Sequence, residues 1–224
     1  AQAQIIERFG RSPSYVVSCA GVAPAGALLT SPVKMFTRAF DINAAANVVL
    51  AQAFLPAMIS NNHGHFMTVA SSASYFSLPN LCAYSMSKTA ALAFLESLRA
   101  ELRAVYKACR VRTSVVTPTK VRTVLAEGLN EGDDDFLMPV LEPIQVARAM
   151  ADTLNSGLSR NISLPLGSAL LPYLRALPEW YRGALRAMGN TDALVTPESI
   201  SRGQQALRGH QSNLDHMKKL GVHS

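Results

Sequence analysis

The spacing of apolar and polar positions along the chain predicts its secondary structure. Short runs rich in β-branched residues predict buried strands at 14–20, 65–70, 112–117 and 161–166. Longer stretches with helical composition predict helices at 33–59, 83–107 and 144–154. Because strands and helices alternate, we expect a doubly wound parallel α/β sheet, Rossmann-like, with helices on both faces.

Glycine and proline set the expected ends of the helices. The first ten residues are typical of the last turns of a helix that ends at Gly10. Pro56 predicts a kink or an end near the C-terminus of the 33–59 helix. Pro143 and Gly157 are expected at the start and end of the 144–154 helix.

Residues 42–87, between Asp41 and Lys88, contain no Asp, Glu, Lys or Arg. Polar residues and Pro56 interrupt this run, and no part of it reaches about 18 consecutive apolar residues, so we do not expect a membrane span. Most of such a run must be covered by other parts of a fold. We therefore expect it in the core or in a subunit interface.

The segment Ser168–Met188 has apolar residues at helical spacing and Arg175, Arg182 and Arg186 on the opposite face, with an interruption at Pro178. Two interpretations remain open. The segment is either a helix packed on the domain or a basic amphipathic surface that rests on a membrane. Beyond Asn190 the chain is polar, and we expect it to be loosely ordered.

Composition narrows the class of protein. With 224 residues, 49% of them hydrophobic and 16% charged, the chain can build a sizeable core. The net charge of +6 is not gathered into runs, so we expect no nucleic-acid partner. Cys19, Cys82 and Cys109 form no Cys-x-x-Cys pair and indicate free thiols in a reducing compartment. The spacing of the histidines predicts no metal site.

The segment Tyr84-Ser85-Met86-Ser87-Lys88 is a candidate catalytic motif. It places Tyr84 and Lys88 one turn apart on one helix face. A nearby cation lowers the pKa of a phenol, which would make Tyr84 usable as a general acid and base. Ser71 follows a predicted buried strand, at the carboxyl edge where open α/β sheets bind ligands, and its hydroxyl could polarise a substrate carbonyl. A surface lysine beside an ordinary helical tyrosine is the structural alternative.

Further segments occur in a consistent order around this motif: Cys19–Val22, Asp41–Asn43, Val69–Ser72 and Pro118–Thr123. With them, most of residues 1–167 resembles the short-chain dehydrogenase/reductase family. The segments 53–58 and 62–65 are most similar to its retinol and 17β-hydroxysteroid dehydrogenase branch. Enzymes of that branch act on lipid-like alcohols and ketones, and many are associated with the endoplasmic reticulum or lipid droplets.

The resemblance implies a role for each matching residue. Tyr84 would exchange the proton at the substrate oxygen, Lys88 would lower its pKa and hold the nicotinamide ribose, and Ser71 would orient the carbonyl. Asn43 would anchor a proton-relay water. The cofactor, NAD or NADP, would also contact residues of three loops: Ala20, Gly21, Pro118, Val121 and Thr123.

One departure from the family concerns the cofactor's pyrophosphate. The family binds it at a Gly-rich turn before a helix, and no two glycines of this chain are separated by one residue. We therefore expect a shortened Rossmann-like domain at 1–167, an amphipathic extension at 168–190 and a polar tail at 191–224. The strand at 15–19 would then form a bare edge of the sheet.

The expected function is that of an NAD(P)-dependent oxidoreductase for a hydrophobic alcohol or ketone, such as a retinoid or steroid. The loop 118–143 and the C-terminal segment would form the substrate mouth. A homodimer would form through helices 43–59 and 83–107. Peripheral contact with the endoplasmic reticulum or a lipid droplet, on the cytoplasmic side, is also implied. The alternative is a catalytically incompetent fragment that acts as an interaction or membrane-surface protein.

Overall fold

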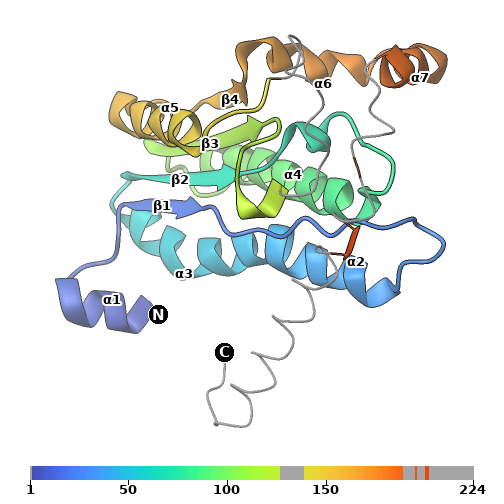
Figure 1. Ribbon diagram of the computed structural model, residues 1–224. Helices are drawn as coiled ribbons and strands as arrows, with labels where there is room; N and C mark the ends of the chain where they lie inside the picture. Colours follow the sequence, from blue (N-terminus) through green and yellow to red (C-terminus); the bar gives the residue numbers. More distant parts are fainter. Residues whose placement is uncertain (1, 127–138, 189–194, 196–199, 202–224) are drawn as a thin grey trace, which may run out of the picture.

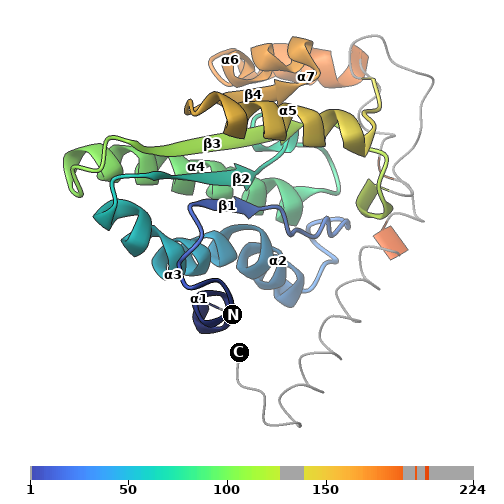
Figure 2. The same ribbon diagram turned by 90° about the vertical axis from the view of Figure 1, so that its left-hand side faces the viewer.

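The computed structural model describes residues 2–126, 139–188, 195 and 200–201. Its centre is a four-stranded parallel sheet in the order β1-β2-β3-β4, with helices on both sides (Figures 1 and 2). The strands are β1 (Tyr15–Ser18), β2 (Gly64–Val69), β3 (Val111–Pro118) and β4 (Asn161–Leu164). The predicted parallel α/β sheet is thereby confirmed.

Successive residues of the central strands face two different cores. Phe66 and Val115 pack with α3 (Ala46–Ser60) and α4 (Cys82–Ala104) on one face. Their neighbours Met67 and Val116 pack with α5 (Pro143–Ser156) on the other face. This alternation follows from the two-residue period of a strand. Because the sheet is covered on both faces, nearly every residue of β2 and β3 is buried, polar residues included.

The long helix expected over 33–59 consists of three segments in one run. They are α2 (Val33–Phe40), a π-helical turn η1 (Asp41–Ala45) and α3. The departure from α geometry lies at η1, whereas Pro56 lies inside α3, which continues to Ser60. By length and a mean hydropathy of 1.6, the run Val33–Ser60 could cross a membrane. In this fold its α3 part supplies side chains to the core against β1 and β2.

Glycine and proline residues mark the ends of the shorter helices. α1 (Gln2–Phe9) ends before Gly10, and Gln2 donates to the backbone oxygen of Ala53 on α3. α5 begins at Pro143 and ends at Gly157, which has the left-handed φ of 64°. Both helix ends agree with the sequence-based expectation.

The C-terminal segment forms η4 (Leu166–Leu170), α6 (Leu171–Leu174) and α7 (Glu179–Met188), with the expected interruption around Pro178. α7 turns its arginine face toward the protein. Arg186 lies 5.0 Å over the Phe76 ring and bonds to Ser77 O, and both Arg182 and Arg186 pair with Glu179. The apolar face therefore points outward, the reverse of a basic amphipathic surface.

The strand β1 is the edge of the sheet within the described residues. Val16 faces the α3/α4 core, while its neighbours Tyr15 and Val17 are exposed. The bare edge expected at this strand is present in the part of the chain that the structure describes.

Candidate active site at the carboxyl ends of the strands

Three strands deliver the candidate residues to one edge of the sheet. Because β1, β2 and β3 are parallel, their carboxyl ends lead to Gly21, Ser71 and Pro118 on the same side. α4 begins nearby, and its first two turns carry Tyr84 and Lys88. The fold thus gathers residues that lie far apart in the sequence.

Lys88 is a buried cation, 3% exposed. Its Nζ donates to Val69 O of β2 at 2.8 Å and lies 6.0 Å from the centroid of the Tyr84 ring. An ammonium group has three N–H bonds. Within the part of the chain that the structure describes, the other two have no acceptor, so they are open to a ligand.

The pKa values of this pair are governed by desolvation. Burial raises the pKa of Tyr84 above its ordinary value of 10.0, and a hydrogen bond with the Ser71 side chain opposes the rise. Burial also lowers the pKa of Lys88 to about 8, which a charge on Cys19 opposes. The sequence-based expectation of a lowered Tyr84 pKa is therefore not met here, because the loss of water outweighs the hydrogen bond with Ser71.

Asn43 ties the loop after β1 to α4. Its Oδ1 accepts the Val22 N–H at 2.9 Å, and its Nδ2 donates to Val22 O and to Ser87 Oγ at 2.8 Å each. Ser87 Oγ in turn donates to Tyr84 O. Both side chains are buried. These hydrogen bonds fix the Asn43 amide in one position, which suits either a structural or a catalytic role.

Gly21 is required by the close approach of these groups. A Cβ atom at this position would lie 3.1 Å from Asn43 Oδ1 and 3.3 Å from Lys88 Nζ. Such contacts are tighter than ordinary packing allows, so a side chain here would displace the amide or the ammonium group. The glycine keeps the backbone close to Lys88 without filling the space in front of it.

The other proposed cofactor contacts are spread over the surrounding loops. Ala20 is exposed, and Pro118 is buried at the end of β3. Val121 pairs with Leu141 in an isolated bridge, and Thr123 is exposed and donates to Val121 O. Among the described residues, neither of these two is hydrogen-bonded to Tyr84 or Lys88, and residues 127–138 of the same loop lie outside the described chain.

These residues fit one half of a nicotinamide cofactor. A buried cation with open donors, beside a bare glycine backbone, suits the hydroxyls of the nicotinamide ribose. The buried hydroxyl of Thr119, next to Pro118, has no partner in the described residues and could bind a polar ligand group. For the pyrophosphate, the 224 residues contain no Gly-x-Gly turn.

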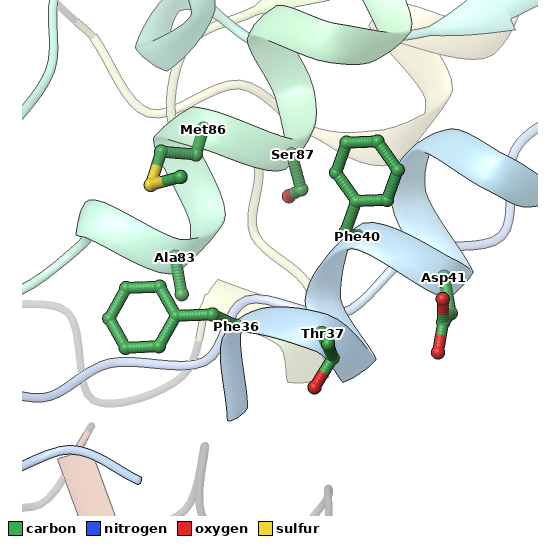
Figure 3. Close-up of a pocket in the computed structure, with 7 residues that line it drawn as sticks. All are labelled: Phe36, Thr37, Phe40, Asp41, Ala83, Met86 and Ser87. Atoms are coloured by element: carbon green, nitrogen blue, oxygen red, sulfur yellow. The ribbon is translucent and has the colours of Figure 1, made fainter. Parts of the chain in front are cut away.

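A separate hollow of about 220 Å³ lies between α2 and α4 (Figure 3). Its lining is mainly apolar: Phe36, Thr37, Phe40, Asp41, Ala83, Met86 and Ser87. Ser87 is the member that also bonds to Asn43. The hollow therefore lies behind the candidate site, and Ser71, Tyr84 and Lys88 do not line it.

Three residues around Asn43 were missed by the sequence analysis. Ser87 bonds to Asn43, and Thr68 and Asn47 connect Asn43 to β2. Asn47 follows Asn43 by four residues within an apolar helix, which is a signal for a buried amide with a specific partner. Ser87 stands inside the Tyr84–Lys88 motif, where its position alone could have indicated a supporting role.

Relatives among the curated proteins include steroid and retinol dehydrogenases. Estradiol 17-beta-dehydrogenase 11 from Homo sapiens is 37% identical over 175 residues, which cover 77% of this chain and 56% of that protein. Epidermal retinol dehydrogenase 2 from Mus musculus is 35% identical over 141 residues, covering 63% and 45%. The chain therefore spans about half the length of these relatives.

Solved structures share the fold. An alcohol dehydrogenase from Thermococcus sibiricus complexed with 5-hydroxy-NADP has a TM-score of 0.61 at 22% identity, covering 73% of this chain and 66% of that one. A 3-oxoacyl-[acyl-carrier protein] reductase with bound NAD from Brucella melitensis has a TM-score of 0.59 at 22% identity, covering 72% and 64%. A family model described as short chain dehydrogenase matches residues 1–134, more than half of the chain. The chain therefore belongs to the short-chain dehydrogenase family.

Proposed function

We propose that the chain carries the catalytic half of an NAD(P)-dependent oxidoreductase that interconverts a hydrophobic alcohol and its carbonyl compound. The proposal rests on the buried Lys88. Its ammonium group donates to Val69 O, lies beside the Tyr84 ring and has further N–H donors for a ligand. A buried cation without an acidic partner is costly, and such a cost is usual at functional sites. The steroid and retinol dehydrogenases among the relatives support a lipid-like substrate.

The side chains have complementary roles in this reaction. A bound nicotinamide cofactor supplies or accepts the hydride. Tyr84 donates its phenolic proton to the carbonyl oxygen during reduction and takes the proton from the alcohol during oxidation. Ser71 donates a hydrogen bond to the same oxygen. Lys88 stabilises the phenolate by its charge and binds the ribose hydroxyls, and Asn43 holds the loop and α4 in register.

Direct binding and turnover test the proposal. We expect the folded chain to bind NADH or NADPH and to oxidise or reduce a retinoid or steroid, with Tyr84→Phe removing turnover by about 10²–10⁴-fold. Tyr106→Phe is the matched control, because Tyr106 is exposed beyond the other end of α4. Unchanged turnover in Tyr84→Phe contradicts the assigned role. A folded chain that binds neither nucleotide favours the alternative of a non-catalytic fragment.

A membrane or lipid-droplet surface is the proposed partner of the C-terminal segment, residues 168–190. Trp180 and Met188 are 74% and 84% exposed, and Leu166, Leu170 and Tyr173 are exposed with them. Aromatic and aliphatic side chains of this kind favour the boundary between headgroups and acyl chains. Because Arg186 contacts Phe76 and Ser77, and both Arg182 and Arg186 are paired with Glu179, apolar burial would drive the contact more than anionic charge.

Trp180 is the single tryptophan of the chain, so its fluorescence reports this contact directly. We expect a blue shift and co-flotation with phosphatidylcholine vesicles, both reduced in Leu170→Ser/Met188→Ser. Val33→Ser/Val49→Ser serves as the control, since these exposed residues lie on α2 and α3. An unshifted emission without co-flotation rejects the membrane contact and leaves the enzyme proposal intact.

A further inference from the structure

A series of buried hydrogen bonds connects β2 to Asn43 through Asn47, a residue with no role in the proposed reaction. Thr68 on β2 donates through Oγ1 to Asn47 Oδ1 at 3.2 Å. Asn47 Nδ2 donates to the backbone oxygens of Asn43 at 2.9 Å and of Ala44 at 3.2 Å. Thr68 and Asn47 are 1% and 2% exposed. The strand that leads to Ser71 is therefore bonded to the turn that carries Asn43.

This turn needs support from outside itself. In η1 the N–H of Ala46 donates to Asp41 O, five residues earlier, which is π-helical geometry. Such turns are rare, and uncommon backbone geometry persists where the surrounding structure holds it. The Asn47 amide bonds two carbonyl oxygens of the turn at once, and Thr68 fixes the orientation of that amide.

The bonds continue from the turn into the candidate site. Asn43 exchanges two hydrogen bonds with the Val22 backbone, next to Gly21, and donates to Ser87 on α4. A rotation of the turn would therefore move the loop after β1 and the Tyr84–Lys88 turn relative to each other. Neutral side chains and backbone groups make all of these hydrogen bonds.

We infer that Asn47 and Thr68 are positioning residues, which set the orientation of Asn43 and through it the alignment of Gly21 with Lys88. The catalytic consequence rests on the proposed function, whereas the geometric part does not. Thr68→Val removes the donor to Asn47 while keeping the shape of the side chain, and Thr68→Ser keeps the donor. Asn47→Asp keeps the acceptor for Thr68 and loses the donors to the turn.

The backbone amide of Val22 reports the orientation of Asn43, because its N–H donates to Asn43 Oδ1. Hydrogen exchange of the full chain, followed by NMR, is the decisive measurement. We expect Thr68→Val and Asn47→Asp to accelerate exchange at Val22 by up to about tenfold, the scale of one lost hydrogen bond. Thr68→Ser is expected to match the wild type. Val115, which donates to Arg160 O elsewhere in the sheet, is the reference for global stability.

Each outcome decides the inference. A larger acceleration at Val22 than at Val115, relative to the wild type, supports it. This holds even in a chain that shows no oxidoreductase activity, a result that would contradict the proposed function alone. Equal acceleration at both amides means that Asn47 and Thr68 only stabilise the fold, and this overturns it. Unchanged exchange at Val22 in both variants also overturns it. In an active chain, the inference further requires Thr68→Val to lower kcat and Thr68→Ser to restore it.

Discussion

At the scale of single residues, two buried ionisable groups carry a cost of desolvation: Lys88 in the candidate site, and His65 at the amino end of β2, away from that site. The ammonium group of Lys88 lies in the interior and donates to a backbone carbonyl, Val69 O. His65 is buried in β2 with Nε2 2.8 Å from Ser114 Oγ, and its Nδ1 has no partner in the described residues. Both groups have lowered pKa values because burial disfavours their charged forms.

Replacing Lys88 by Met is expected to stabilise the fold at pH 7. The pKa of Lys88 is about 8 in the folded chain and 10.5 as a model value, so stability rises with pH between those values. Below pH 8 the buried ammonium group destabilises the fold. We expect Lys88→Met to raise the free energy of unfolding by about 1–2 kcal/mol, less than the full shift because Val69 O loses its donor.

Urea unfolding at pH 7 measures this effect, and Lys34→Met on the exposed face of α2 is the control. A Lys88→Met chain that is less stable than the wild type would show that the hydrogen bond to Val69 O outweighs the desolvation of the charge.

His65 predicts a loss of stability in mild acid. Burial and the neighbouring Arg112 lower its pKa from 6.5 to about 4. As the pH falls from 6.5 to 4, the unfolded chain binds a proton that the folded chain does not, so stability decreases by at most about 3 kcal/mol. The pH dependence of urea unfolding should flatten in His65→Gln. The pH dependence should persist in His63→Gln, since His63 is exposed. The same pH dependence of stability in both variants would refute the assignment of this effect to His65.

At the scale of elements, periodicity predicted the helices and strands within a few residues. What it could not predict depends on tertiary contacts. The π turn at Asp41–Ala45 is held by bonds to Val22, Ser87 and Asn47, of which two come from distant parts of the chain. The orientation of α7 was also missed, because an amphipathic pattern does not say which face meets the protein, and Phe76, Ser77 and Glu179 bind the arginines.

The candidate site, like the helices and strands, could be predicted from the sequence only in part. Ser71, Tyr84 and Lys88 stand at recognisable spacings, so sequence patterns could propose them. The direction of the Tyr84 pKa shift could not be foreseen, since it depends on how much water the fold removes from the phenol.

The end of α5 allows a prediction about one glycine. Gly157 has a φ of 64°, and a Cβ atom there would meet nothing within 4 Å. Gly157→Ala should therefore cost about 1 kcal/mol through backbone strain alone. Gly167→Ala, which is equally free of contacts and has no such φ, should be near neutral. Thermal unfolding compares the two, and equal effects would refute the strain argument.

At the scale of the whole molecule, apolar side chains are exposed on two sides. One group is on α6 and α7, and the other is on α2 and α3, with Val33, Phe40, Val48 and Val49 as members. Val48 and Val49 of the second group belong to the stretch 42–87, whose lack of charge predicted an interface. We propose that a second copy of the chain covers it, as the resemblance to the family also implies.

Sedimentation velocity tests this dimer. Val49→Arg places a charge at a residue that is 65% exposed on α3, and it should convert a dimer into monomers without unfolding the chain. Val124→Arg, at an exposed position in the loop after β3, should leave the dimer intact. A wild-type chain that sediments as a monomer at micromolar concentration contradicts the proposed interface.

The π turn also sets the rotational phase between two helices. Its hydrogen bond runs from Ala46 back five residues to Asp41, so the turn encloses one residue more than an α turn. Deleting a single alanine from Asp41–Ala45 would therefore let the turn close with α geometry, and α3 would keep its buried face toward the sheet. The same deletion in the middle of α3 would rotate every later residue of that helix by about 100°.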